Sequence, residues 1–184
     1  MRAFLAFEVS DAVIENLVLV EEELRGTGAD LKAVGRDNLH FTVKFLGDVP
    51  DATVKEIDER LGGLALSGFD VRVRGVGAFP DPGRPRVVWA GLSRESEGAM
   101  NEAAAAFIRA LEGVGKPEDH EFHPHITLAR VRSPPGNSGA LASFLRLNAD
   151  RDLGETRIVS LKLKSSQLLP SGPVYTDVRE YGLR

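Results

Sequence analysis

The sequence predicts an α+β fold of mainly antiparallel strands, with helices packed on the faces of the sheet. Segments of alternating apolar residues are interspersed with amphipathic helical segments, and the order helix, strand, helix, strand, strand occurs in each half of the chain. A length of 184 residues suits one domain, or two small lobes that share a core. We therefore expect one folded unit with an approximate internal repeat.

The first half of the chain is expected to begin with a strand and a helix. Ser10 suits the N-cap of this helix, because its side-chain oxygen can accept a hydrogen bond from an unpaired amide of the first turn. Gly26 suits the end of the helix. The elements expected in this half are a strand at 2–9, a helix at 10–25, a strand at 39–46, a helix at 50–62, and strands at 69–79 and 86–92.

The second half restarts the same order after a short break. A Pro- and Gly-rich loop at 133–139 separates its first strand from a short helix. The expected elements are a helix at 95–111, a strand at 122–131, a helix at 140–147, and strands at 157–164 and 174–181. The strands at 39–46 and 122–131 fall at matching places in the two halves.

The composition excludes several classes of function. The chain has no cysteine, which rules out disulfides, thiolate metal sites and a cysteine nucleophile, and fits a reducing compartment. A net charge of -4 provides no global basic field for wrapping nucleic acid, although a local basic groove could hold a short or terminal piece. No apolar segment approaches the roughly 20 residues that cross a bilayer, and the N-terminus does not resemble a secretory signal. We expect a cytoplasmic protein without membrane contact.

Two short segments, LHFTV at 39–43 and PHITL at 124–128, carry a histidine two residues before a threonine. Side chains alternate along a strand, so His40 and Thr42 share one face, as do His125 and Thr127. An imidazole can transfer a proton near neutral pH, and a hydroxyl can donate to an anionic oxygen. Each pair is therefore a compact polar group on a rigid element.

Two such pairs facing each other would suit in-line hydrolysis of a cyclic phosphodiester. This reaction needs a base for the attacking water and an acid for the departing sugar oxygen, on opposite sides of the phosphorus. The threonines would hold the non-bridging oxygens. A single H-x-T segment is commonly structural; two at equivalent places, in a chain with four histidines, favour a site but leave the structural interpretation open.

The segments LHFTVKFLGDV and FHPHITLARV resemble the two HxTx motifs of the two-histidine phosphoesterase superfamily. The whole chain is similar to the RNA 2′,3′-cyclic phosphodiesterases of the LigT/ThpR type, historically called 2′-5′ RNA ligases. The segments MRAFLAFEVS, GRPRVVWAGL and SQLLPSGPVYT extend the resemblance nearly from end to end. It implies a bilobal α+β domain over residues 1–184, with helices on the outer faces and a central cleft.

The resemblance also implies an activity and a role for each motif residue. The activity is metal-independent hydrolysis of a terminal RNA 2′,3′-cyclic phosphate to a 2′-phosphate, without a cofactor. His40 corresponds to the proton donor to the 3′-oxygen and His125 to the proton acceptor from water. Thr42 and Thr127 correspond to the phosphate-binding threonines. The implied partners are RNA 3′ ends or short oligonucleotides, and we expect a monomer.

Three further residues have two alternative positions each. Arg130 carries a guanidinium suited to phosphate oxygens, but strict alternation puts it on the face opposite His125 unless the strand twists. Lys44 shares the parity of His40 and is expected either to border the cleft or to lie at a solvated strand end. Trp89 is expected in the core, with base stacking as the alternative.

Other functions are open at this stage. His120, His123 and His125 invite a metal site, but Pro124 stiffens the segment and no matching carboxylate pattern accompanies them. The same phosphorus chemistry would serve 2′-5′ RNA ligation or hydrolysis of a small cyclic or 2′-5′ nucleotide. A non-catalytic nucleotide-binding module is a further alternative, which loss of either histidine would have favoured.

Overall fold

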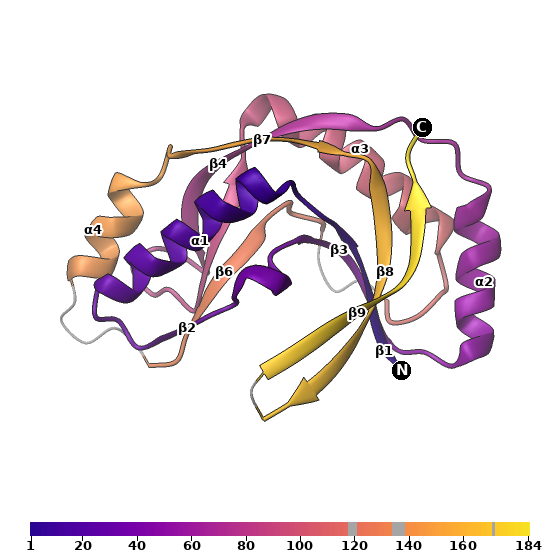
Figure 1. Ribbon diagram of the computed structural model, residues 1–184, viewed down its shortest axis with the longest axis horizontal. Helices are drawn as coiled ribbons and strands as arrows, with labels where there is room; N and C mark the ends of the chain where they lie inside the picture. The colour runs from indigo at the N-terminus through magenta and orange to yellow at the C-terminus, as the bar shows by residue number, and fades with distance from the viewer. Residues whose placement is uncertain (118–120, 134–138, 171) are drawn as a thin grey trace.

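An antiparallel sheet of nine strands organises the described part of the chain. Figure 1 shows the computed structural model. The structure describes residues 1–117, 121–133, 139–170 and 172–184. The strands are β1 (Arg2–Phe7), β2 (Leu31–Ala33), β3 (Phe41–Asp48), β4 (Phe69–Phe79), β5 (Val87–Leu92), β6 (Ile126–Val131), β7 (Asp152–Ile158), β8 (Ser160–Leu169) and β9 (Gly172–Gly182). The helices are α1 (Asp11–Gly26), α2 (Asp51–Gly62), α3 (Arg94–Ala110) and α4 (Gly139–Leu147), with a short 3-10 helix at Arg36–Asn38.

The sheet divides into two halves that meet at its centre. The strand order is β7-β4-β5-β6-β3-β1-β8-β9, with β2 paired to β6. The join between β6 and β3 rests on one residue pair, Phe41 opposite Ile126, whereas the neighbouring strands pair along most of their length. The two strands that carry the H-x-T segments are therefore the central strands of the sheet.

The helices connect the two halves of the chain through the core. Helix α1 buries Val13, Ile14, Leu17, Val20 and Leu24 on one side and packs against β6 and β7, which lie more than 100 residues further along the chain. Helix α3 packs against β3, β4 and β5. Burial of these apolar stripes supplies the main favourable free energy of folding.

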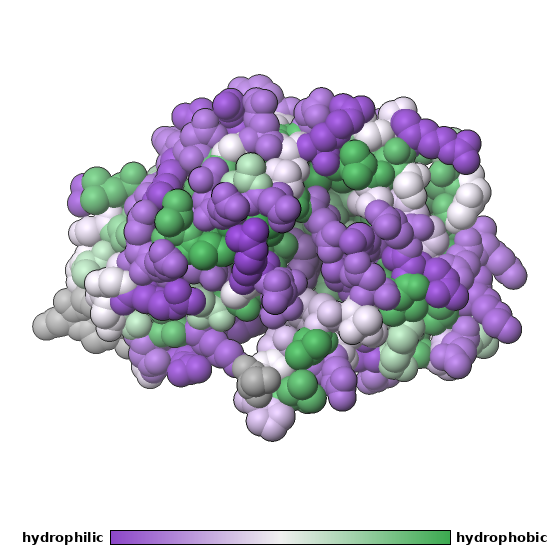
Figure 2. All heavy atoms as spheres, in the orientation of Figure 1, coloured by the Kyte–Doolittle hydropathy of each residue, from purple (hydrophilic) through white to green (hydrophobic). Residues whose placement is uncertain are grey.

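The hairpin of β8 and β9 extends beyond the rest of the sheet at the bottom of the view (Figure 1). Its end carries three exposed apolar side chains, Leu168, Leu169 and Val174, of which Leu168 is 78% exposed. Figure 2 shows apolar atoms at this end, below a largely hydrophilic surface. Among the described residues, no helix combines the length and apolar character needed to span a bilayer.

The predicted fold class is confirmed, and most elements lie within a few residues of their expected bounds. Strand β2 was not expected, because LKA is brief, and neither was most of β7, because DLGETRI is mostly polar. The strand expected at 157–164 covers the end of β7 and the start of β8. Ser10 precedes α1, but its side chain makes no capping hydrogen bond; its backbone N–H donates to Thr156 Oγ1 at 2.9 Å instead. Most of the loop predicted at 133–139 lies outside the described residues.

Candidate active site

The two histidines sit at equivalent points, each directly before the first residue of its strand. Phe41 and Ile126, which follow them, face each other across the sheet and are fully buried. In a regular antiparallel ladder this register places His40 beside Thr127 and His125 beside Thr42. The two histidines are then diagonal neighbours, which lie about 7–8 Å apart in such a ladder. The two motifs thus cross at the centre of the sheet, with both His-Thr pairs on the face opposite Phe41 and Ile126, here called the site face.

Both central strands contain a β-bulge directly after the threonine. Residues 41–45 and 126–130 repeat one burial pattern: buried, half-buried, buried, buried, exposed. In β3, Ala6 is opposite Thr42 while Leu5 is opposite Lys44, so one residue is extra. In β6, Trp89 is opposite Thr127 while Val88 is opposite Ala129. A bulge leaves two residues opposite one and shifts the alternation by one position.

The bulges change the positions expected for Lys44 and Arg130. Lys44 is opposite the core residue Leu5 and is 5% exposed, so the predictions that it borders a cleft or lies at a solvated strand end are both wrong. Phe45 takes the site-face position instead and is 64% exposed. Arg130 is exposed and opposite Val87, which shares the face of Trp89. The bulge therefore brings Arg130 to the site face, where strict alternation did not place it.

The His40 imidazole lies among aromatic rings and charged groups. It stacks on Phe4 with ring centroids 5.1 Å apart and meets Tyr175 edge-on at 5.5 Å. Burial and, after it, the nearby positive charge of Lys164 lower the pKa of His40 to about 4, against opposing contributions from Glu8 and a hydrogen bond to the Asn38 backbone. The neutral imidazole is thus the stable form in the unliganded protein at pH 7.

Four charged residues beside His40 form a closed network. Lys164 contacts Glu8 at 2.5 Å and Asp177 at 2.6 Å, and Lys162 contacts the same carboxylates at 2.6 and 2.7 Å. Partial burial acts to raise the pKa values of Glu8 and Asp177, but the hydrogen bonds from the two lysines outweigh it and lower both. The two carboxylates therefore stay ionised and fix Lys164 next to His40.

The His125 imidazole has a different setting. Its Nδ1 lies 2.7 Å from the His123 carbonyl oxygen, so Nδ1–H donates, and Nε2 carries the lone pair of the neutral ring. Burial lowers the pKa of His125, partly offset by this hydrogen bond. Phe79 meets the ring edge-on at 5.0 Å. A neutral imidazole with a fixed Nδ1–H is suited to accept a proton at Nε2.

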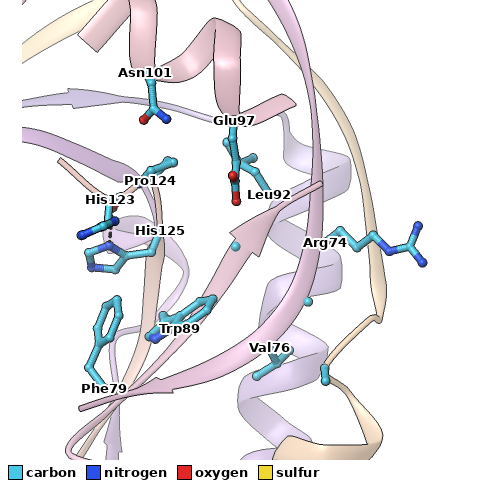
Figure 3. A pocket seen from close by; sticks show the side chains of 13 residues that line it. Arg74, Val76, Phe79, Trp89, Leu92, Glu97, Asn101, His123, Pro124 and His125 are labelled. Carbon is cyan, nitrogen blue, oxygen red and sulfur yellow. Dashed lines mark hydrogen bonds between the residues drawn. The ribbon is translucent and has the colours of Figure 1, made fainter. Parts of the chain in front are cut away.

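A cavity of about 380 Å³ adjoins His125. Figure 3 shows Phe79 and Trp89 on one side of it, Glu97 and Asn101 of α3 on the other, and His123 and His125 at one end. The indole of Trp89 is half-buried and lines this cavity, so the expectation that Trp89 belongs to the core is wrong.

The segment around His125 offers little to a metal ion. Among the described residues, no group of three or more His, Asp or Glu side chains is placed to hold one. His120, the third histidine of that segment, lies outside the described residues. His123 is exposed, and its carbonyl oxygen accepts the hydrogen bond from His125 Nδ1–H. His123 and His125 therefore take part in hydrogen bonding and line the cavity.

An antiparallel α+β sheet with a histidine-threonine pair at the head of each central strand defines the class of two-histidine phosphoesterases. The sequence comparison agrees with the class that the fold and site indicate: the model of the family described as LigT like Phosphoesterase matches residues 7–89 and 91–175. This chain belongs to that family.

Curated relatives align with most of the chain. An RNA 2′,3′-cyclic phosphodiesterase of Archaeoglobus fulgidus is 36% identical over 181 residues, covering 98% of this chain and 99% of the relative. One of Aeropyrum pernix is 37% identical over 169 residues, covering 91% and 95%. A crystal structure from Thermus thermophilus superimposes with a TM-score of 0.82 at 29% identity, covering 100% of this chain and 98% of that one. Escherichia coli LigT in complex with 3′-AMP shares the fold, with a TM-score of 0.77 at 24% identity and coverage of 99% and 97%.

Proposed function

We propose that this protein hydrolyses the 2′,3′-cyclic phosphate at RNA 3′ ends to a 2′-phosphate, without a metal ion. The observation that carries the proposal is the crossing of the two H-x-T segments at Phe41 and Ile126, with both His-Thr pairs on one face. The names of the full-length relatives support the substrate class. We further propose that the protein acts as a cytoplasmic monomer.

The reaction assigns one proton transfer to each histidine. His125 Nε2 accepts a proton from water as its oxygen bonds to phosphorus, and His40 donates a proton to the 3′-oxygen as the P–O3′ bond breaks. The 2′-oxygen stays on phosphorus, so the product is a 2′-phosphate with a free 3′-hydroxyl. The hydrogen bond from Nδ1 to the His123 carbonyl supports the acceptor role, because it leaves the Nε2 lone pair available.

The two threonines and Arg130 bind the anionic phosphate. Thr42 and Thr127 flank the crossing point and present hydroxyl donors for the non-bridging oxygens. Arg130 reaches the same face through the bulge in β6 and adds a fork of N–H donors. The anionic phosphate in turn favours protonated His40, which counters the effect of burial and of Lys164.

The decisive experiment is turnover of an RNA ending in 2′,3′-cyclic phosphate, in EDTA, with identification of the product isomer. We expect a 2′-phosphate, and a decrease in kcat/KM of about 10²–10⁴-fold in His40→Ala and in His125→Ala. Melting curves establish that the variants fold. No turnover by the intact protein, or unchanged turnover in both variants, would refute the mechanism.

A second candidate activity is 2′-5′ RNA joining, in which a 5′-hydroxyl replaces water at the same phosphorus. The cavity of about 380 Å³ beside His125 favours this candidate, because a water molecule occupies only about 30 Å³. Recovery of a 2′-5′ diester from two RNA ends tests it directly.

A further inference from the structure

Aromatic rings line one side of the cavity beside His125, and glycines behind the indole leave space for it. Trp89 in β5 is directly opposite Gly77 in β4. A Cβ on Gly77 would overlap the indole ring, and a Cβ on Gly91 would lie 3.0 Å from its Cζ3. The two glycines thus let the indole lie against the backbone, with Phe79 next to it at a centroid distance of 5.1 Å. A half-buried ring in this position offers a stacking surface for a planar ligand.

The opposite wall of the cavity is polar. Glu97 and Asn101 lie one turn apart on α3, and both side chains are directed toward the space above the indole (Figure 3). A carboxylate only accepts hydrogen bonds, whereas an amide both donates and accepts. Guanine is the base whose Watson–Crick edge presents two adjacent donors, N1–H and N2–H₂, followed by the O6 acceptor. Glu97 can accept from N1–H and N2–H₂, and the side-chain amide of Asn101 can donate to O6.

The position of the cavity determines which nucleoside it would receive. In an in-line displacement the nucleophile enters opposite the leaving oxygen. With His40 beside the leaving 3′-oxygen and His125 beside the nucleophile, the cavity lies on the nucleophile's side. Its volume of about 380 Å³ is within the range of small-molecule sites and far exceeds the need of a water molecule.

We propose that the cavity formed by Trp89, Phe79, Glu97 and Asn101 binds a second nucleoside, with preference for guanine, and presents its 5′-hydroxyl to His125. The 5′-oxygen bonds to phosphorus and its proton passes to His125, while the P–O3′ bond breaks and O3′ takes a proton from His40. The product is a 2′-5′ diester with a free 3′-hydroxyl. This inference rests on the proposed proton roles and specifies the base that the site accepts.

The first test uses fluorescence, because Trp89 is the single tryptophan of the chain. Guanosine is expected to quench it saturably, at a concentration about tenfold lower than inosine, which lacks the N2 amino group, or adenosine. Free N-acetyltryptophanamide corrects for absorption by the nucleosides. Glu97→Gln should abolish the preference for guanosine over inosine. Glu102→Gln, on the same helix but outside the lining of the cavity, should retain it. Absence of saturable quenching, or a preference that survives in Glu97→Gln, would overturn the proposal.

The second test separates the acceptor nucleoside from the reacting nucleotide. With adenosine 2′,3′-cyclic phosphate as phosphate source, added guanosine should yield the 2′-5′ ester, half-maximally at the concentration that half-quenches Trp89. If guanosine instead only raises the KM for the cyclic phosphate, the cavity binds the reacting nucleotide and the acceptor assignment is wrong. Quenching measures binding and needs no turnover. Failure of the intact protein to hydrolyse any cyclic phosphate would therefore refute the proposed activity, while the binding test would keep its meaning.

Discussion

The His40 half and the His125 half of the site share one backbone design but have different surroundings. In each half a histidine directly precedes a central strand, a threonine follows two residues later, and a bulge comes next. His40 then stacks on Phe4 beside the charged network of Lys164 and Glu8, whereas His125 borders an open cavity. The repeat therefore fixes the geometry of the two His-Thr pairs, while the neighbours that do not repeat set the proton affinity of each histidine and the space beside it.

The largest expected effect concerns which half donates the proton. A cyclic phosphorothiolate with sulfur in place of O3′ has a thiolate leaving group, which departs without a general acid because thiols have pKa values near 8.5. We expect this substrate to restore about 10²-fold or more of the activity lost in His40→Ala and to leave His125→Ala impaired. Steady-state rates with both substrates measure the ratio. Rescue of His125→Ala instead would exchange the two roles.

The next effect is the contribution of His40 to the pH dependence of stability. Its pKa is about 4 in the folded protein, against about 6.5 when unfolded. Between these values the unfolded chain binds more protons, so the free energy of unfolding falls as the pH decreases from 6.5 toward 4. From pH 7 to pH 5 this amounts to about 2 kcal/mol.

The matched variant for this prediction is His40→Phe, which removes the titrating group and keeps a ring against Phe4. Urea unfolding at pH 7 and pH 5 measures the difference between the two proteins. The variant should lose about 2 kcal/mol less than the wild type over this interval. Equal losses in the two proteins would show that His40 is not held neutral by its surroundings.

A smaller effect separates the two lysines of the network. Lys164 lowers the pKa of His40 by its charge, and Lys162 is not among the causes of that shift. Lys164→Met should therefore raise the pKa of His40 and move the limb of the kcat/KM profile that reports His40 to higher pH. The variant also leaves Glu8 less neutralised, which acts in the same direction. Lys162→Met provides the control in the same strand. Equal shifts in both variants would assign the effect to the network as a whole.

The sequence predicted the elements that carry the histidines but not the course of the strands after them. Alternation correctly placed His40 with Thr42 and His125 with Thr127, because both pairs precede the bulges. It failed at Lys44 and Arg130, since a bulge depends on cross-strand pairing that no local pattern records. The burial of Lys44 was especially hard to foresee, because lysine is rarely buried.

Trp89 shows a second limit of sequence-based prediction. Its place in an apolar strand suggested the core, but its true position depends on Gly77 in the neighbouring strand and on Gly91 two residues further along β5. The pairing of Gly77 with Trp89 arises only when β4 and β5 fold together. Glu97 and Asn101 were not singled out either, because a helix surface is ordinarily polar and their common direction appears only once α3 packs beside β5.

The single pairing of Phe41 with Ile126 has a kinetic consequence. Each histidine immediately precedes one member of this pair, so any change in the spacing of β3 and β6 moves the two imidazoles together. In the proposed mechanism, the distances for the two proton transfers then vary as one coordinate rather than independently. Fluctuations of this junction on the microsecond to millisecond timescale, measured by relaxation dispersion at the amides of the two strands, would set how often both transfers are in reach at once.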